Sequence, residues 1–407
     1  MVIGTHTSRC QNRPVDTQAR RETLRSLFDV ALASVEPERL TREALSEGPG
    51  GPATLIAIGK AAPAMCRGAA AAIGQVTGIC VTDHVEEVPT GLELVVGDHP
   101  VPGDRSFSAG RMVLEAVTRS TGRIVALVSG GGSALCEHPV EGVPAEFLAE
   151  ASRVMLDRGA SIGEMNLVRR HLSAIKGGGL LEAAGRPIET YAISDVCGAD
   201  PNVIASGPTV PQSVDPEAAL SVLRRIGIEV PLEVAGAVSN ARPGPRGRAN
   251  ITVLADGRTA AQAMADESHR LEIASAVTPG WLSGPVARAL EVFILDGRPG
   301  LHVAAGEPVV EVVGRGSGGR NTHAALLAAS AISGSDSLFA AFATDGVDGN
   351  SRSAGAIVDG DTIARGGDPA ASLDSSDSAT YLAKTGDLVV TGPTGTNVAD
   401  IWVHWRS

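Results

Sequence analysis

Aromatic residues are scarce in this sequence: Phe, Trp and Tyr together make up 3% of its 407 residues, although 43% of the residues are hydrophobic. A hydrophobic core must therefore be built mainly from Ala, Val, Leu and Ile. Glycine is abundant, with 49 residues, which is typical of an α/β chain with many tight turns. Because a chain of this length usually exceeds a single core, we expect two or three domains.

Basic residues are outnumbered by acidic ones. The 34 Lys and Arg residues stand against 46 Asp and Glu residues, and the formal net charge is -12. Such a chain repels the phosphate backbone, so we expect no nucleic acid among its partners. A small anionic ligand is not excluded, because local Lys and Arg side chains and helix N-termini decide how such a ligand is held.

Cysteine pairs and long apolar runs are also missing. No CxxC motif occurs, and no apolar run approaches the roughly 18 residues that a membrane span requires. Residues 1–15 lack the apolar segment of a signal peptide. We therefore expect a cytoplasmic protein with no membrane partner and free thiols; a homodimer is left open. The scattered cysteines are Cys10, Cys66, Cys80, Cys136 and Cys197.

Short apolar stretches alternate with helical ones in the first half of the chain. Predicted strands end near Ile58, Thr82, Gly97, Ser129 and Asp195, with helices between most of them. This alternation predicts a Rossmann-like, three-layer α/β domain in which helices cover both faces of a parallel sheet.

A Pro-, Gly- and Arg-rich linker at residues 241–248 suggests a domain boundary and a hinge. We predict an N-terminal α/β domain over residues 16–240 and a C-terminal α/β domain over 249–407. The second domain is expected to include strands at Ile251–Asp256 and Pro308–Val313. The active site is expected in the cleft between the two domains.

The stretch from Ile188 to Val210 begins as a buried strand and ends abruptly at Ser194 and Asp195. A loop rich in Gly, Pro, Asp, Ser and Thr follows. Ligands of α/β proteins bind beyond the carboxyl ends of parallel strands, so Asp195 is a candidate site residue. The alternative is a carboxylate that caps the following turn.

Lys60 directly follows another predicted strand, in the sequence Ile58-Gly59-Lys60-Ala61. At the start of a helix it would attract an anion. The stretch is not a Walker A loop, because Thr54 replaces its first glycine and Ala61 its Ser or Thr. The alternative is a solvated lysine.

A triple-glycine loop, Ser129-Gly-Gly-Gly-Ser133, follows a third strand. Its bare backbone N–H groups could wrap phosphate oxygens. A nucleophilic Ser133 is the alternative, but a hydrolase elbow needs glycine two residues on either side of the serine, and Leu135 breaks that pattern.

A second glycine-rich loop, residues 314–319, satisfies GxGxxG and raises the alternative of a dinucleotide site. The acidic residue that such a site needs about twenty residues later is not well placed, because Asp336 lies in a turn. Arg320 and Asn321 follow at a helix start, where they would suit an anion that needs fixed donors.

Asp345 and Asp348 lie in a glycine-rich turn after a further strand. They could hold a divalent cation, although the spacing is not that of an EF-hand; a plain turn is the alternative. Together with Lys60, Arg320 and the triple-glycine loop, these carboxylates are the equipment of phosphoryl transfer, in which positioning and charge neutralisation dominate.

The chain closely resembles the glycerate 2-kinase family, which joins an N-terminal DUF4147-type domain to a smaller, mixed-sheet MOFRL domain (here about 305–405). The strings that carry the resemblance include LVSGGGSALCEHP (127–139), NLVRRHLSAIKGGGL (166–180), ISDVCGADPNVIASGPTVP (193–211), GRGSGGRNTHAALLAA (314–329) and ATDGVDGNSRSAGAIVD (343–359). The resemblance implies phosphorylation of D-glycerate at its 2-hydroxyl with ATP and Mg²⁺.

The resemblance also implies residue roles. Lys60 and Arg320 correspond to residues that the family associates with catalysis, and Asp195 is added as a catalytic or Mg²⁺-binding carboxylate, with Asp345 as a second metal ligand. Arg320 would hold the substrate carboxylate; which of the two carboxylates accepts the hydroxyl proton is left open. The predicted cofactor-binding residues are Ser129, Gly130, Gly131, Gly132, Ser133, Ser194, Ser206, Gly207, Thr209 and Asn321.

The chain departs from the family pattern at Gly179, Pro285 and His323. These departures keep two alternatives in view, a changed hydroxy-acid substrate and a lost activity. A nicotinamide-dependent hydroxypyruvate reductase is a further alternative, and its support in the sequence is the GxGxxG match.

Overall fold

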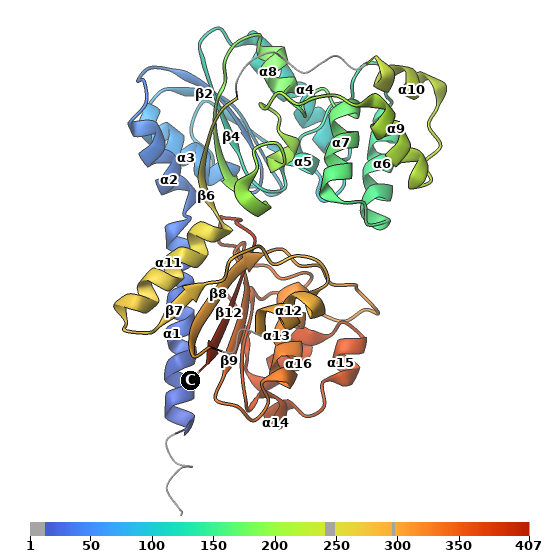
Figure 1. Cartoon of the computed structure of the whole chain (residues 1–407). Helices are drawn as coiled ribbons and strands as arrows, with labels where there is room; N and C mark the ends of the chain where they lie inside the picture. The colour runs from blue at the N-terminus through green and yellow to red at the C-terminus, as the bar shows by residue number, and fades with distance from the viewer. Residues whose placement is uncertain (1–12, 241–248, 295–297, 407) are drawn as a thin grey trace, which may run out of the picture. The chain divides into compact units, whose positions relative to one another are not determined.

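The computed structural model describes residues 13–240, 249–294 and 298–406, which form two compact units (Figure 1). The parallel-sheet unit comprises the described residues of 36–256 together with Gly395–Val398. The mixed-sheet unit comprises those of 13–35, Gly257–Thr394 and 399–406.

All strands of the first sheet are parallel, in the order β3-β2-β1-β4-β5-β6. Its central strand β1 pairs with β4 so that Ile58 lies opposite Val128. The turns that follow these two residues are therefore neighbours at one edge of the sheet. The strands are β1 (Ala53–Ile58), β2 (Val76–Thr82), β3 (Leu92–Val96), β4 (Arg123–Val128), β5 (Glu189–Ser194) and β6 (Asn250–Asp256).

Helices of this unit form two groups. Helix α4 packs on the sheet through Val113 and Val117, whereas α6, α7, α9 and α10 share a second, smaller core (Figure 1). Helix α7 begins at Ser161, whose side chain forms a capping box with Glu164. The helices are α2 (Pro37–Ser46), α3 (Ala62–Ile73), α4 (Asp104–Arg119), α5 (Gly132–Leu135), α6 (Ala145–Asp157), α7 (Ile162–Leu172), α8 (Gly179–Ala184), α9 (Pro216–Arg225) and α10 (Leu232–Ser239), with short 3₁₀ turns η1 (Cys197–Ala199) and η2 (Ile204–Ser206).

The second sheet is mixed, in the order β11-β10-β9-β12-β8-β7. Strand β12 runs antiparallel to both β8 and β9, while β7 and β8 are parallel. The strands are β7 (Ser275–Val277), β8 (Gly300–Gly306), β9 (Leu338–Ala343), β10 (Gly355–Asp359), β11 (Leu388–Val389) and β12 (Asp400–Arg406). The predicted fold class, two α/β domains with a parallel and a mixed sheet, is confirmed.

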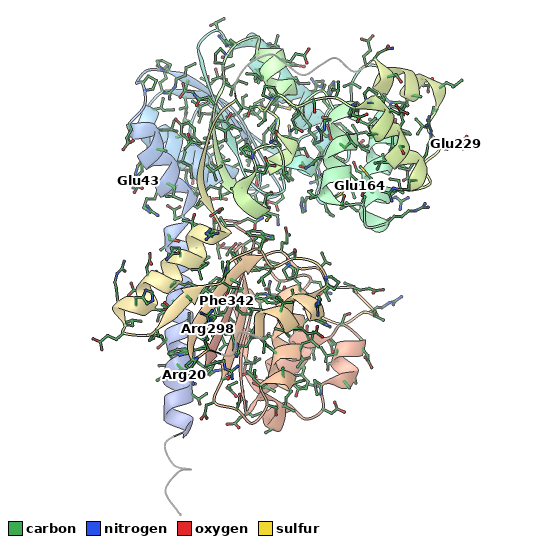
Figure 2. All side chains as sticks on the ribbon, in the orientation of Figure 1. Arg20, Glu43, Glu164, Glu229, Arg298 and Phe342 are labelled. Carbon is green, nitrogen blue, oxygen red and sulfur yellow. The ribbon has the colours of Figure 1, made fainter. Side chains whose placement is uncertain are left out.

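The few aromatic residues are concentrated in the mixed-sheet unit. Phe339 meets Phe293 and Trp402 edge-on beneath α12, α13 and α16. On the other face Phe342 (Figure 2) stacks on Phe28 of α1 with ring centroids 4.3 Å apart. The helices of this unit are α1 (Arg13–Ser34), α11 (Gly257–Arg270), α12 (Val286–Ile294), α13 (Arg320–Ala331), α14 (Thr362–Gly366), α15 (Ala370–Asp374) and α16 (Ser378–Thr385).

The division of the chain differs from the predicted one. Strand β6 pairs with β5 and completes the parallel sheet, whereas α1 packs with α11 in the mixed-sheet unit. A composition break marks a linker but does not reveal which sheet the next strand joins. The predicted linker and hinge, residues 241–248, lie outside the described residues.

The predicted strand Pro308–Val313 is wrong. Apart from one isolated bridge at Val309, this stretch is a loop, and the side chains of Val309, Val312 and Val313 are exposed. The valines of this stretch favour a strand by propensity alone, while the actual strand β8 lies earlier, at Gly300–Gly306.

None of the described helices is both long and apolar enough to cross a membrane. The cysteines within the described ranges, Cys66, Cys80, Cys136 and Cys197, are free thiols.

Candidate active site

The turns after β1 and β4 are hydrogen-bonded to each other. The N–H of Lys60 donates to the carbonyl of Gly130 over 3.0 Å, and the N–H of Ala61 donates to Ser129 Oγ over 3.0 Å. Gly59 has φ +132°, and a Cβ there would lie 2.2 Å from Ser129 Oγ. The Ser129 hydroxyl thus supports the turn that carries Lys60, and Gly59 allows the close approach.

The triple-glycine loop offers backbone donors. Among the described residues, the N–H groups of Gly130, Gly131 and Ser133 have no acceptor, whereas that of Gly132 donates to the Ser129 carbonyl over 3.4 Å. Gly131 has φ +81°, and a Cβ there would lie 3.3 Å from Lys60 Cγ and 3.5 Å from His99 Cδ2. Bare amides beside a lysine form a suitable surface for phosphate oxygens.

Asp195 also lies close to this loop. A Cβ added to Gly130 would come within 2.1 Å of Asp195 Oδ2, so only glycine allows the carboxylate to approach so closely. Asn397 Nδ2 donates to the same oxygen over 3.1 Å. Lys60 and Asp195 are both half-buried. The structure therefore brings together three predicted elements, the lysine, the glycine loop and this carboxylate.

Lys60 also acts on Asp83, a residue that the sequence analysis did not single out. Burial alone would raise the pKa of Asp83, but the hydrogen bond with His84 and the charge of Lys60 outweigh burial and lower this pKa. Asp83 is therefore a carboxylate near the lysine, beyond the end of β2.

Ser133 and Ser206 meet over 2.8 Å, and the Ser206 hydroxyl donates to Asn166 Oδ1 of α7. The segment that presents Ser206 is strained, because Ala205 and Ser206 have φ +48° and +63°. Two carbonyl groups of this segment accept hydrogen bonds from the glycines before α8. Gly177 N–H donates to Ser206 O over 3.0 Å, and Gly178 N–H donates to Gly207 O over 2.8 Å. Such over-determined strain is common at functional sites.

Two other predicted cofactor-binding hydroxyls accept hydrogen bonds from groups of the protein itself. Ser194 Oγ accepts the N–H of Val196 over 3.1 Å, and Thr209 Oγ1 accepts from Thr190 over 2.9 Å, with Thr209 almost fully buried. Their contact with a ligand stays a prediction.

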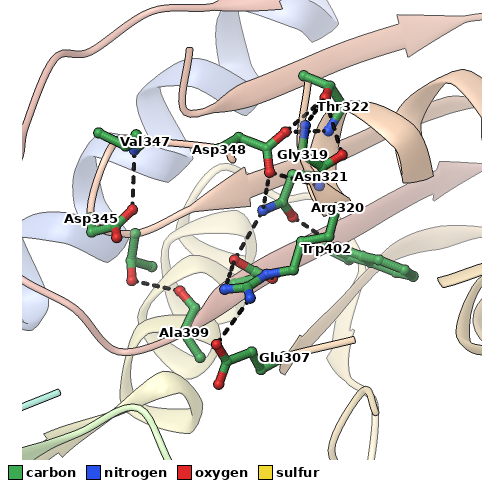
Figure 3. Close-up of polar contacts among 12 residues, drawn as sticks. Glu307, Gly319, Arg320, Asn321, Thr322, Asp345, Val347, Asp348, Ala399 and Trp402 are labelled. Atoms are coloured by element: carbon green, nitrogen blue, oxygen red, sulfur yellow. Dashed lines mark hydrogen bonds and ion pairs between the residues drawn. The ribbon is translucent and has the colours of Figure 1, made fainter. Parts of the chain in front are cut away.

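In the mixed-sheet unit, Arg320 is held by two carboxylates (Figure 3). Its Nε donates to Asp400 Oδ2 over 2.5 Å, its Nη2 to Asp400 Oδ1 over 3.3 Å, and its Nη1 to Glu307 Oε1 over 2.9 Å. Asn321 uses its amide internally as well: Nδ2 donates to Asp400, and Oδ1 accepts the indole N–H of Trp402 over 3.1 Å. Asn321 thus supports Arg320 and Asp400.

The protonation of this pair depends on opposing forces. Burial disfavours the charge of Arg320, but Asp400 and Glu307 outweigh it and raise the pKa of Arg320. Burial raises the pKa of Asp400 to about 7 in spite of its donors. Arg320, which keeps a third of its side chain exposed, therefore stays charged, whereas the fully buried Asp400 comes close to protonation at neutral pH.

Asp348 caps helix α13. Its oxygens accept from the N–H groups of Asn321 and Thr322, over 2.9 and 2.8 Å, and from Thr322 Oγ1 over 2.7 Å (Figure 3). The expectation that Asp345 and Asp348 form one cation site is therefore wrong for Asp348. Asp345 accepts the N–H of Val347 over 3.0 Å and is half-buried. Within the described ranges, no group of three or more His, Cys, Asp or Glu side chains could hold a metal.

The GxGxxG loop does not offer its backbone to a ligand. The N–H groups of Gly316, Ser317, Gly318 and Gly319 donate to Ser375 O, Asp377 Oδ1, Asn350 Oδ1 and Thr322 Oγ1. Its glycines are needed for packing, since a Cβ at Gly316 would lie 2.6 Å from the Asp377 backbone. A dinucleotide site requires free amides at this position, so the match does not indicate one.

Sequence reasoning missed Asp400, Glu307, Asn397 and Asp83. A signal was available for Asp400 alone, as an acidic residue directly before the apolar run Ile401-Trp402-Val403 of β12. The others come from loops whose partners are distant in sequence.

The fold and these two sets of residues define an α/β protein with a phosphate-loop-like turn in one unit and, in the other, an Arg–Asp pair whose aspartate is buried. Residues 23–239 match the model of the domain of unknown function DUF4147, and residues 300–400 match the MOFRL family. The chain belongs to the family that joins these two domains, which includes proteins named glycerate 2-kinase, so the predicted family is confirmed.

Relatives match over nearly the whole length. D-glycerate 2-kinase from Thermotoga maritima is 35% identical and covers 95% of this chain and 98% of its own. A protein of Agrobacterium vitis with the provisional name hydroxypyruvate reductase is 37% identical, over 97% and 96%. The crystal structure of glycerate kinase from Thermotoga maritima matches with a TM-score of 0.86 and 32% identity, over 96% of this chain and all of that one.

Proposed function

We propose that the protein is an ATP-dependent glycerate 2-kinase that phosphorylates the 2-hydroxyl of D-glycerate and releases 2-phosphoglycerate. The observation that carries this proposal is the position of Lys60 against Gly131, in a loop whose N–H groups at 130, 131 and 133 have no acceptor among the described residues. The names of the kinase relatives support the choice of D-glycerate as the acceptor.

The residues of the β1 and β4 turns suit the phosphate end of a nucleotide. Lys60 would neutralise charge on the transferring group, and the loop amides would fix its oxygens. Gly59 and Ser129 keep the lysine and the loop in register. Bound ATP with Mg²⁺ would supply the phosphoryl group and neutralise much of its charge.

The described carboxylates fit Mg²⁺ held mainly through a substrate. Mg²⁺ usually keeps several waters and takes one or two carboxylates together with phosphate oxygens, so a dedicated cluster of three side chains is not required. Asp195, half-buried against Gly130, is suited to such a role or to accepting the hydroxyl proton. Asp345 stays the second candidate.

Arg320 is a proposed catalytic group whose orientation is fixed before substrate arrives. Three of the five N–H donors of a guanidinium are engaged by Asp400 and Glu307. The remaining donors would face the reacting groups in a single orientation, which reduces the reorganisation needed in the transition state. The prediction that the active site lies between the domains stays a prediction.

The reductase alternative is weaker. Its sequence support was the GxGxxG match, and the amides of that loop are occupied by side chains and carbonyls of the same unit. Gly179, one of the positions at which the chain departs from the family pattern, is required by the local backbone. A Cβ there would lie 2.1 Å from Ala174 O, so no larger side chain fits. It therefore gives no support for lost activity.

A coupled assay of ADP release with ATP, Mg²⁺ and D-glycerate tests the proposal, with ³¹P NMR to locate the phosphate. We expect turnover that yields 2-phosphoglycerate. ADP release with another hydroxy acid alone would keep the kinase and change its substrate. NADH-dependent reduction of hydroxypyruvate without any ADP release would replace the proposal with the reductase.

A further inference from the structure

Arg169 is a nearly buried arginine that forms no hydrogen bond with any of the described residues. It lies in α7 and is 8% exposed. No acceptor among the described residues lies within hydrogen-bond distance of its guanidinium, and the nearby carboxylate of Glu137 forms no ion pair with it. Burial lowers the pKa of Arg169, and the charge of Glu137 offsets only part of this effect.

Glu137 is already engaged by other groups. It forms a buried ion pair with Lys176 Nζ and also accepts from Ser173 Oγ and from the N–H of His138. The buried cluster of Arg169, Lys176 and Glu137 therefore holds two cations and one carboxylate. Because Lys176 is paired with Glu137, the unpaired positive charge of this cluster is that of Arg169.

The C-terminal turn of α7 does not account for this arginine. A cation near a helix C-terminus is weakly favoured, but burying an unpaired charge is far more costly. Proteins retain such a group where an anion arrives to pair with it, and a guanidinium matches the two oxygens of a carboxylate.

The surroundings of Arg169 point to the same region as the glycine loop. Asn166 lies one turn earlier on the same face of α7 and accepts from Ser206, which in turn bonds Ser133. The 133–137 segment contributes both Ser133 and Glu137. Hydrogen bonds thus run from Asn166, one turn before Arg169, through Ser206 to Ser133 of the loop that is proposed to hold phosphate.

We infer that Arg169 binds the carboxylate of the small hydroxy-acid substrate. The inference rests on the proposed function for the identity of that acid, and it replaces the earlier expectation that Arg320 has this role. Arg320 already forms ion pairs with Asp400 and Glu307, whereas the nearly buried guanidinium of Arg169 forms no ion pair with any described residue.

The test compares Arg169→Met with Arg169→Lys and with Arg170→Met as a matched control. Arg170 is the next residue of the same helix, and its guanidinium donates to the carbonyls of Asn166 and Ser213. We expect Arg169→Met to raise the KM for D-glycerate by about 10- to 100-fold, as loss of a charge-assisted pair implies, with the KM for ATP unchanged. Arg169→Lys should lie between, and Arg170→Met should resemble the wild type.

Stability separates binding from a structural role. Without ligand, Arg169→Met should unfold no earlier than the wild type, because it removes an unpaired buried charge. A lower unfolding temperature with unchanged D-glycerate affinity would overturn the inference. A raised KM for ATP alone would assign Arg169 to a nucleotide phosphate and would equally overturn the carboxylate assignment. If Arg169→Met does not fold, Arg169→Lys carries the kinetic comparison.

Calorimetric titration without ATP separates this inference from the proposed function. D-glycerate, glycolate, L-lactate and inorganic phosphate are titrated into wild type and variants. Binding of a hydroxy acid that depends on Arg169, in a protein without kinase turnover, would leave the inference standing while the proposed function fails. Turnover of D-glycerate with wild-type KM in both Arg169 variants would overturn the inference and leave the proposed function standing. A wild type that binds none of these acids would also overturn the inference.

Discussion

The two glycine-rich loops of this protein look alike in sequence and differ in what their backbones do. The loop at 130–133 leaves the N–H groups of Gly130, Gly131 and Ser133 without acceptors among the described residues. The loop at 314–319 uses four consecutive N–H groups on its own unit. Glycine in the first allows close approach of charged side chains, Lys60 and Asp195, and in the second it allows close packing of backbone.

A glycine pattern alone does not identify an anion site. What decides is whether the amides already have acceptors, because a satisfied donor gains nothing from a ligand. Asp377, Asn350 and Thr322 supply those acceptors in the second loop, and they come from sequence positions that the GxGxxG motif does not include.

The largest effect is expected from removing the cation beside the first loop. Lys60→Ala should lower kcat/KM by about a hundredfold or more, because charge on the transferring group loses its stabilising partner. Lys384, an exposed lysine of the mixed-sheet unit, provides the control, and Lys384→Ala should retain wild-type kinetics. A change of less than about threefold in Lys60→Ala, under 1 kcal/mol of transition-state stabilisation, would contradict the assignment.

The two aspartates after β9 test the same distinction in the mixed-sheet unit. Asp348→Ala removes the acceptor of several donors at the start of α13 and should lower the free energy of unfolding by about 2–4 kcal/mol. Asp345→Ala removes the acceptor of the Val347 N–H and should lower it by about 1 kcal/mol, because Asp345 is half-buried whereas Asp348 is almost fully buried. Urea unfolding of both variants measures the difference, and equal losses would show that Asp345 is structural too.

Much of the fold could be predicted from periodicity. The parallel strands β1, β2, β4 and β5 are short, apolar and followed by glycine or polar residues, so both their existence and their functional ends were visible. Strand β8 was missed because His302 and the small residues around it resemble no buried strand, and the exposed valines after it do. Edge membership, as for β6, depends on pairing that no local pattern encodes.

The candidate site was predictable where one segment supplies the chemistry. Lys60, the triple-glycine loop and Asp195 each follow a strand end, and parallel pairing brings them together. Asp400 and Arg169 were not found, because their importance depends on partners: Asp400 fixes Arg320 across 80 residues, and Arg169 matters because it has no counter-ion among the described residues.

A matched pair of alanine substitutions sharpens the contrast between the loops. Gly131→Ala forces alanine into a left-handed conformation beside Lys60 and His99, which costs about 1–2 kcal/mol, and should raise the KM for ATP by roughly tenfold. Gly316→Ala meets the Asp377 backbone instead and should cost about 1–3 kcal/mol of stability, with normal kinetics in the folded protein. Kinetics and urea unfolding are needed for both. An unchanged KM for ATP in Gly131→Ala would place the phosphates elsewhere.

The last expected effect is a pH dependence that differs between the units. Asp400 has its pKa raised to about 7 by burial, so the folded protein holds this proton more tightly than the unfolded chain does. Its stabilising contribution is complete below the ordinary carboxyl pKa and is lost as the pH rises toward 7, by about 1 kcal/mol between pH 6 and 7. Asp83 in the parallel-sheet unit has a lowered pKa, and its contribution is present at neutral pH and lost in acid. Urea unfolding of wild type and Asp400→Asn from pH 4.5 to 8 isolates the first effect. If the two proteins respond to pH in parallel, the Arg320–Asp400 pair keeps its charge throughout, and the pKa of Asp400 lies well below 7.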